Sequence, residues 1–141
     1  MPFLKEFIIN HNTKIKLWEI NLGELDHHGL DEYDTELVKL KKNELAKEQF
    51  LAVRKTLQLE NQGYKIRYDE SGRPLINSDL NISISHSKFM AAIVFSENNK
   101  AGIDIEHKEN KIINIQNKFL NDSEKLENEY QSDVDYLTMI W

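Results

Sequence analysis

Cysteine is absent from this chain of 141 residues, and proline and glycine occur only two and five times. Without cysteine the protein has no disulfides, no thiolate metal ligands and no cysteine nucleophile. The longest apolar run, residues 90–95, is far shorter than the ~20 residues that cross a bilayer. The first residues, MPFLKEF, show no basic segment followed by an apolar one, so no signal peptide is predicted. A cytoplasmic globular protein with no membrane partner is therefore expected.

Positive charge is also scarce, because 18 Lys and Arg face 24 Asp and Glu for a net charge of −6. A nucleic-acid-binding protein normally presents a basic face, so nucleic acid is not an expected partner. The imbalance lies in residues 101–141, which hold four basic and nine acidic side chains. A solvated acidic surface explains this most simply, and a cation site is the alternative.

Hydrophobic spacing predicts a mixed fold of the α/β class, more closely of the α+β type. Residues 31–59 have a helical pattern whose apolar stripe is Ala46, Phe50, Val53 and Leu57. Alternating or continuous apolar residues predict neighbouring strands at 82–87, 89–96 and 101–106. We expect these three strands to form an antiparallel meander, with the helix over residues 46–57 packed on it.

The C-terminal region has a helical pattern that does not end. Asn121 precedes Glu124 by three residues, which is typical of a helix N-cap. Val134, Leu137 and Trp141 then fall on one helical face with no stop signal after them. We therefore expect two subdomains, residues 1–106 and an incomplete 107–141. The apolar face of this unfinished helix would favour self-association.

Two carboxylates stand two residues apart in the segment Gly102-Ile-Asp-Ile-Glu106. On a strand, Asp104 and Glu106 would project to the same side. A divalent cation relieves the repulsion between such a pair, and oxygen ligands suit Mg²⁺ or Mn²⁺. A solvent-facing pair without a metal is the alternative reading of the spacing.

A second polar group ends the strand expected at residues 82–87. Ser85, His86 and Ser87 offer two hydroxyls and an imidazole, which can donate hydrogen bonds to a phosphate. A turn of small polar residues is the simpler alternative. A Ser-His-Asp hydrolase built from Ser85, His86 and Asp104 is disfavoured, because the sequence has no G-x-S-x-G elbow.

Several cations form the third group, namely Lys41, Lys42, Lys47, Arg54 and Arg73. They are ordinary surface charges unless an anion lies against the helix that carries most of them.

The order of these signals resembles the 4'-phosphopantetheinyl transferase family of the surfactin-synthetase-activating type. The matching segments are ISISHS, GIDIE, KFLNDSE with Phe119 and Glu124, and the final Trp141. Upstream, FLAVR and the turn Gly72-Arg-Pro74 are similar to the family's basic helix and its G-K-P turn. The resemblance covers roughly residues 35–141.

The resemblance implies an enzyme that transfers the phosphopantetheine arm of coenzyme A to a serine of an acyl or peptidyl carrier protein. Asp104 and Glu106 would hold Mg²⁺, with Mn²⁺ possible, and would form the catalytic set together with His86. Ser85 and His86 would contact the phosphates of coenzyme A. Arg54 and Arg73 would lie near its 3'-phosphate. The implied fold is the first half of a pseudo-dimer plus the start of its second half.

One part of the family pattern, K-E-A-x-x-K after the tryptophan, does not follow Trp141. Its Glu is the family's third metal ligand, so these 141 residues are expected to be impaired in catalysis. The alternative hypotheses are a non-catalytic module that binds coenzyme A or a carrier protein, and a domain without a ligand.

Overall fold

The computed structural model of the chain describes residues 4–125 and 134–135. They belong to two units, Met1–Ile105 and Glu106–Trp141, each of which is described by itself. Among the described residues, no helix is both long enough and apolar enough to cross a membrane.

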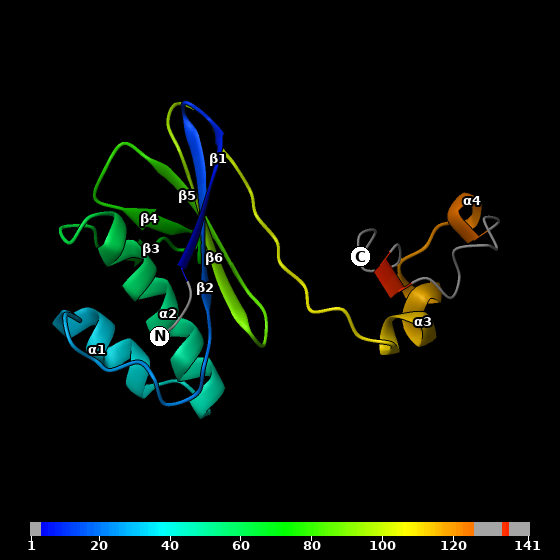
Figure 1. Cartoon of the computed structure of the whole chain (residues 1–141), viewed down its shortest axis with the longest axis horizontal. Coiled ribbons are helices and arrows are strands. Elements are labelled where there is room, and N and C mark those ends of the chain that lie inside the picture. Colours follow the sequence, from blue (N-terminus) through cyan, green and yellow to red (C-terminus); the bar gives the residue numbers. More distant parts are fainter. Residues whose placement is uncertain (1–3, 126–133, 136–141) are drawn as a thin grey trace. The chain divides into compact units, whose positions relative to one another are not determined.

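A four-stranded antiparallel sheet is the centre of the first unit (Figure 1). Its strands are β1 (Leu4–Asn10), β2 (Thr13–Glu19), β5 (Asn81–His86) and β6 (Met90–Ser96), in the order β1-β2-β6-β5. The buried central strand predicted at residues 89–96 is confirmed, because β6 lies between β2 and β5 and its residues from 91 onward are all buried. The expected antiparallel sheet is present.

Two helices account for the predicted helical stretch 31–59. Helix α1 (Glu32–Lys39) begins after Asp31, whose side chain accepts a hydrogen bond from the Asp34 N–H. Helix α2 (Glu44–Glu60) begins after Asn43, whose side chain accepts from the Ala46 N–H. Each cap satisfies a backbone donor that the first turn leaves free, so the chain can restart a helix within a few residues.

Helix α2 packs on one face of the sheet, as the sequence predicts. Val53 and Leu57 share a core cluster with the β6 residue Ile93. Phe50 differs, because it belongs to a second cluster in which it meets Val38 of α1. The predicted apolar stripe of α2 therefore serves two neighbours, the sheet and the preceding helix.

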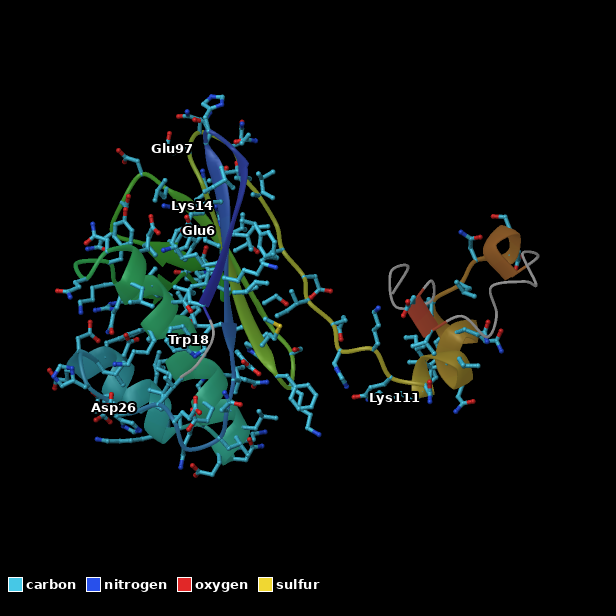
Figure 2. The ribbon with its side chains drawn as sticks, viewed as in Figure 1. Glu6, Lys14, Trp18, Asp26, Glu97 and Lys111 are labelled. Atoms are coloured by element: carbon cyan, nitrogen blue, oxygen red, sulfur yellow. The ribbon has the colours of Figure 1, made fainter. Side chains whose placement is uncertain are left out.

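Ion pairs fasten the end of α2 to β2. Lys14 and Lys16 both pair with Glu60, and the Lys16 Nζ lies 2.8 Å from Glu60 Oε2 and 3.3 Å from Glu6 Oε2. Figure 2 shows Glu6 and Lys14 on the adjacent strands β1 and β2. Burial alone would lower the pKa of Lys16, but its bonds to the two glutamates raise it.

A short hairpin lies between α2 and β5 in the sequence. Its strands are β3 (Ile66–Tyr68) and β4 (Pro74–Ile76). Asp69 Oδ1 accepts hydrogen bonds from the backbone N–H groups of Ser71 and Arg73, which closes the turn. Gly72 within it has φ +83°, a left-handed conformation that favours glycine. The turn predicted at this point is confirmed.

The strand predicted at residues 101–106 is wrong. These residues form no backbone ladder; instead the Ile103 N–H donates to Ser83 Oγ (3.3 Å) and the Ile105 N–H donates to Ser85 Oγ (3.1 Å). The second neighbour of β6 in the sheet is β2, which takes the place that the expected meander gave to residues 101–106. The segment therefore follows β5 through serine hydroxyls and without strand pairing.

The second unit contains short helical segments. These are α3 (Lys111–Ile115), the 3₁₀ turn η1 (Gln116–Lys118) and α4 (Asp122–Lys125). Among the described residues of this unit, Ile112 and Leu120 are apolar and buried. Residues 111–118 are thus helical in two adjoining pieces.

Helix α4 begins directly after Asn121, where the sequence predicts a helix start. Val134 is half-buried and packs against the apolar cluster of Ile112 and Leu120. Leu137 and Trp141, the other residues of the expected apolar helix face, lie outside the described residues.

Candidate functional site

A pocket of about 540 Å³ opens between α2, the β3–β4 hairpin and the end of β5. Lys41, Arg54 and His86 bring nitrogen groups to its lining, and none of the described residues that line it is a carboxylate. The described residues that line it are Lys41, Ala46, Gln49, Phe50, Val53, Arg54, Tyr68, Gly72, Pro74, Ile84, Ser85 and His86. The pocket therefore combines an apolar floor with cations and hydroxyls, a composition suited to an anionic organic ligand.

Three of the residues predicted from the sequence to bind coenzyme A meet in this pocket, namely Arg54, Ser85 and His86. They come from α2 and from the last two residues of β5, about thirty positions apart in the chain. The Gln49 side chain donates to the Ser87 carbonyl (2.9 Å), which ties the chain just beyond β5 to α2. This hydrogen bond fixes the position of Ser85 and His86 relative to the helix.

Arg54, which was expected to lie near a phosphate of the ligand, is almost completely buried and only 2 % exposed. Its Nε and Nη2 donate to Asp34 Oδ1 at 3.0 and 2.9 Å, and its Nη1 donates to Tyr68 Oη at 3.2 Å. Burial alone would lower the pKa of Arg54, but the bonds to Asp34 and Tyr68 raise it. Arg54 is thus a permanently charged part of the pocket wall, with most of its donors already used.

The ring of Phe50 contacts two of the cations that line the pocket, Lys41 and Arg54. The Arg54 guanidinium lies 4.1 Å from the centre of the Phe50 ring, and the Lys41 Nζ lies 5.0 Å from the same centre. A ring face attracts cations through its quadrupole, so Phe50 keeps both charges close together. Two adjacent positive charges, of which only Arg54 is paired with a carboxylate in the described contacts, favour a negatively charged ligand.

The segment that carries the predicted metal ligands reaches this pocket through Ser85. Ser85 Oγ donates to Asp104 Oδ1 (3.0 Å) and accepts from the Ile105 N–H. Ser85 also lines the pocket, so one hydroxyl joins the pocket to the first carboxylate of the pair. The structure therefore brings together two of the motifs that the sequence singled out separately.

The donor set at Asp104 and Glu106 agrees in chemistry with Mg²⁺, which is commonly held by one or two carboxylates plus phosphates and waters. Both side chains are exposed. Asp104 ends the first unit together with Ile105, and Glu106 begins the second. Within residues 4–125 and 134–135, no group of three or more His, Cys, Asp or Glu is arranged to hold a metal ion.

Arg73 does not line the main pocket. It lines a smaller one of about 250 Å³ together with Lys100 and Ser83, and this pocket shares Pro74 and Ile84 with the main one. The predicted set of phosphate-binding residues is therefore divided between two pockets with a common wall.

Sequence reasoning missed two residues of the main site. Asp34 is 5 % exposed and neutralises Arg54 from α1, twenty positions away. Tyr68 ends β3 and lines the pocket. No short-range pattern connects either residue to Arg54, because both contacts depend on how α1 and the hairpin pack against α2.

In comparisons with known proteins, no protein-family model matches this chain and no curated protein matches it.

Proposed function

We propose that this chain binds coenzyme A in the main pocket and takes part in transferring its 4'-phosphopantetheine arm to a serine of an acyl or peptidyl carrier protein. The observation that carries the proposal is the hydrogen bond from Ser85 Oγ to Asp104 Oδ1. It joins the S-H-S strand end to the D-x-E segment, the two motifs on which the family resemblance depends most.

The main pocket supports the binding half of the proposal. Its lining supplies a lysine and a histidine beside a buried arginine, and a nucleotide with several phosphates needs such charge-assisted donors. Its apolar walls, which include Val53 and Ile84, offer a surface for an uncharged ring. In this proposal the residues that contact coenzyme A are Lys41, Ser85 and His86, with Arg54 behind them and Arg73 in the adjoining pocket.

The reaction in this proposal is a phosphoryl-type transfer. The carrier serine gives its proton to solvent, its oxygen forms a bond to the β-phosphorus, and the bond from the β-phosphorus to the bridging oxygen breaks, so that 3',5'-ADP leaves with that oxygen. Donors that face the phosphates stabilise the charge that develops on their oxygens. His86, exposed at the end of β5, would serve as such a donor.

Asp104 and Glu106 are the residues that would hold Mg²⁺ or Mn²⁺ in this proposal. A divalent ion there would neutralise part of the charge of the diphosphate. Ser85 would then have two roles in this proposal. It lines the pocket for coenzyme A, and its hydroxyl proton restricts the orientation of the Asp104 carboxylate that would bind the metal. We further propose that the unit Met1–Ile105 corresponds to the first half of the family's two-part architecture.

Calorimetric titration with coenzyme A tests the binding half. We expect His86→Ala to weaken binding about tenfold, because it removes a donor to a charged group. His27→Ala is the matched control, since His27 is exposed in the loop before α1 and does not line the pocket. Equal affinity of the His86 variant and the control would remove His86 from the site, and no binding by the unaltered protein would overturn the proposal.

A carrier-loading assay with Mg²⁺ tests the transfer half. We expect Asp104→Asn to slow loading by at least about tenfold, since even outer-shell changes at metal sites have effects of that size. Asp79→Asn is the control, an exposed carboxylate in the loop before β5. Full activity of the Asp104 variant would remove this residue from the metal site. Binding of coenzyme A without any transfer would identify the alternative, a non-catalytic module that binds coenzyme A or a carrier protein.

A further inference from the structure

Tyr68 occupies a position in the main pocket to which the family resemblance assigns no role. It is the last residue of β3 and lines the pocket together with Ser85 and His86. The residue is 40 % exposed, so it is not enclosed in the core. It lies directly before the Asp69 turn, whose hydrogen bonds fix the hairpin.

The hydroxyl of Tyr68 accepts a hydrogen bond from a buried cation. Arg54 Nη1 donates to Tyr68 Oη at 3.2 Å, and the guanidinium carbon lies 5.7 Å from the centre of the Tyr68 ring. Asp34 holds the other side of the guanidinium through Nε and Nη2. The direction of the Arg54–Tyr68 bond is certain, because an arginine only donates and the tyrosine oxygen must therefore accept.

The proton of the Tyr68 hydroxyl is left for another acceptor. Among the described residues, no hydrogen bond with Tyr68 as donor occurs, and no carboxylate lines the pocket that could take this proton. A hydroxyl whose oxygen accepts from a cation becomes a stronger donor, since each bond in such a chain polarises the next. The chain Asp34–Arg54–Tyr68 therefore presents an activated O–H donor at the pocket wall.

We propose that Tyr68 donates this proton in a hydrogen bond to the phosphomonoester of coenzyme A, which is its 3'-phosphate. The inference rests on the proposed function, because it takes coenzyme A as the ligand. The phosphomonoester carries more negative charge per phosphorus than the diphosphate, and Lys41 and Arg54 place two cations against one aromatic ring beside Tyr68. The most highly charged group of the ligand is the one that this arrangement suits.

Titrations with coenzyme A and with dephospho-coenzyme A, which lacks the 3'-phosphate, test the inference. Tyr68→Phe keeps the ring beside Arg54 and removes only the hydroxyl. We expect it to weaken coenzyme A binding about tenfold and to leave dephospho-coenzyme A binding unchanged. Tyr33→Phe is the matched control, because Tyr33 is 36 % exposed on α1, stacks on Arg67 and does not line the pocket.

The outcomes separate the inference from the proposed function. If the unaltered protein binds coenzyme A and Tyr68→Phe binds it equally well, the role of Tyr68 is wrong and the proposed function stands. If Tyr68→Phe weakens both ligands to the same extent, the hydroxyl does not contact the 3'-phosphate and the inference is overturned. If the unaltered protein binds neither ligand, the proposed function and the inference both fail. Thermal unfolding of both variants shows whether their folds are intact.

Discussion

Two segments with similar sequence patterns, strand β6 and residues 101–106, differ in how they contact β5. The sequence predicts a strand both for the β6 segment and for residues 101–106, as neighbours in one antiparallel meander. Strand β6 is hydrogen-bonded to β5 along its length and is buried from Ala91 to Ser96. Residues 101–105 reach β5 only through the hydroxyls of Ser83 and Ser85, and their isoleucines are half-buried.

The difference shows that alternation alone does not create a strand. The β6 residues are apolar on both faces, so β6 is most stable where a neighbouring strand and α2 cover it. Residues 101–106 are apolar at every second position only, with Ala101, Ile103 and Ile105, and the other three positions are a glycine and two acids. Such a segment gains little from deep burial, so side-chain hydrogen bonds are enough to decide where it lies.

The largest effect on stability should come from shortening one buried side chain in β6, compared with the same change in residues 101–106. Ile93→Ala in β6 should lower the free energy of unfolding by about 2–5 kcal/mol, because Ile93 is fully buried. Ile103→Ala should cost about 1 kcal/mol or less, because Ile103 is half-buried. Chemical denaturation of both variants measures the difference. Equal losses would mean that residues 101–106 are as much a part of the core as β6.

A smaller effect on stability is expected from the ion pairs between Glu60 and β2, the strand that lies beside β6. Burial opposes the charged form of Glu60, but hydrogen bonds from Lys14 and Lys16 lower its pKa below the ordinary 4.5. Its stabilising contribution is complete above that value and is lost as the pH falls through the lowered pKa of the folded state. Glu60→Gln should remove about 1–3 kcal/mol at neutral pH.

Unfolding curves recorded between neutral and acidic pH provide the measurement. The acid-induced loss of stability should be smaller in Glu60→Gln than in the unaltered protein, since the variant has no charge to lose at this position. Glu70→Gln, an exposed residue in the β3–β4 turn, is the control. A pH dependence identical to that of the unaltered protein would show that these ion pairs do not stabilise β2.

The smallest effect should appear at the serines that hold residues 101–105. Ser85→Ala should speed amide hydrogen exchange at Ile105 a few-fold, because a hydrogen bond at a partly exposed site is worth about 0.5–1 kcal/mol. Ser83→Ala should do the same at Ile103 and leave Ile105 unchanged. Exchange measured residue by residue by NMR distinguishes the two. Unchanged exchange at both amides would show that the hydroxyls do not hold the segment.

The sequence predicted the elements whose signals are local. The turn around Gly72, the helix over residues 46–57 and the buried strand at residues 89–96 each depend on neighbours a few positions away, and each is present. The candidate site was predicted in part. Ser85 and His86 do share a pocket with Arg54, whereas Arg73 lines the adjoining one.

Long-range contacts explain what the sequence could not predict. The burial of Arg54 depends on Asp34, and the availability of the Tyr68 proton depends on Arg54, so both follow from how α1 and the hairpin meet α2. The pairing of β6 with β2 joins residues about eighty positions apart, and no periodicity within either segment encodes it. Periodic patterns record which face of an element is apolar, but only tertiary packing decides which other element covers that face and which buried charge finds its partner.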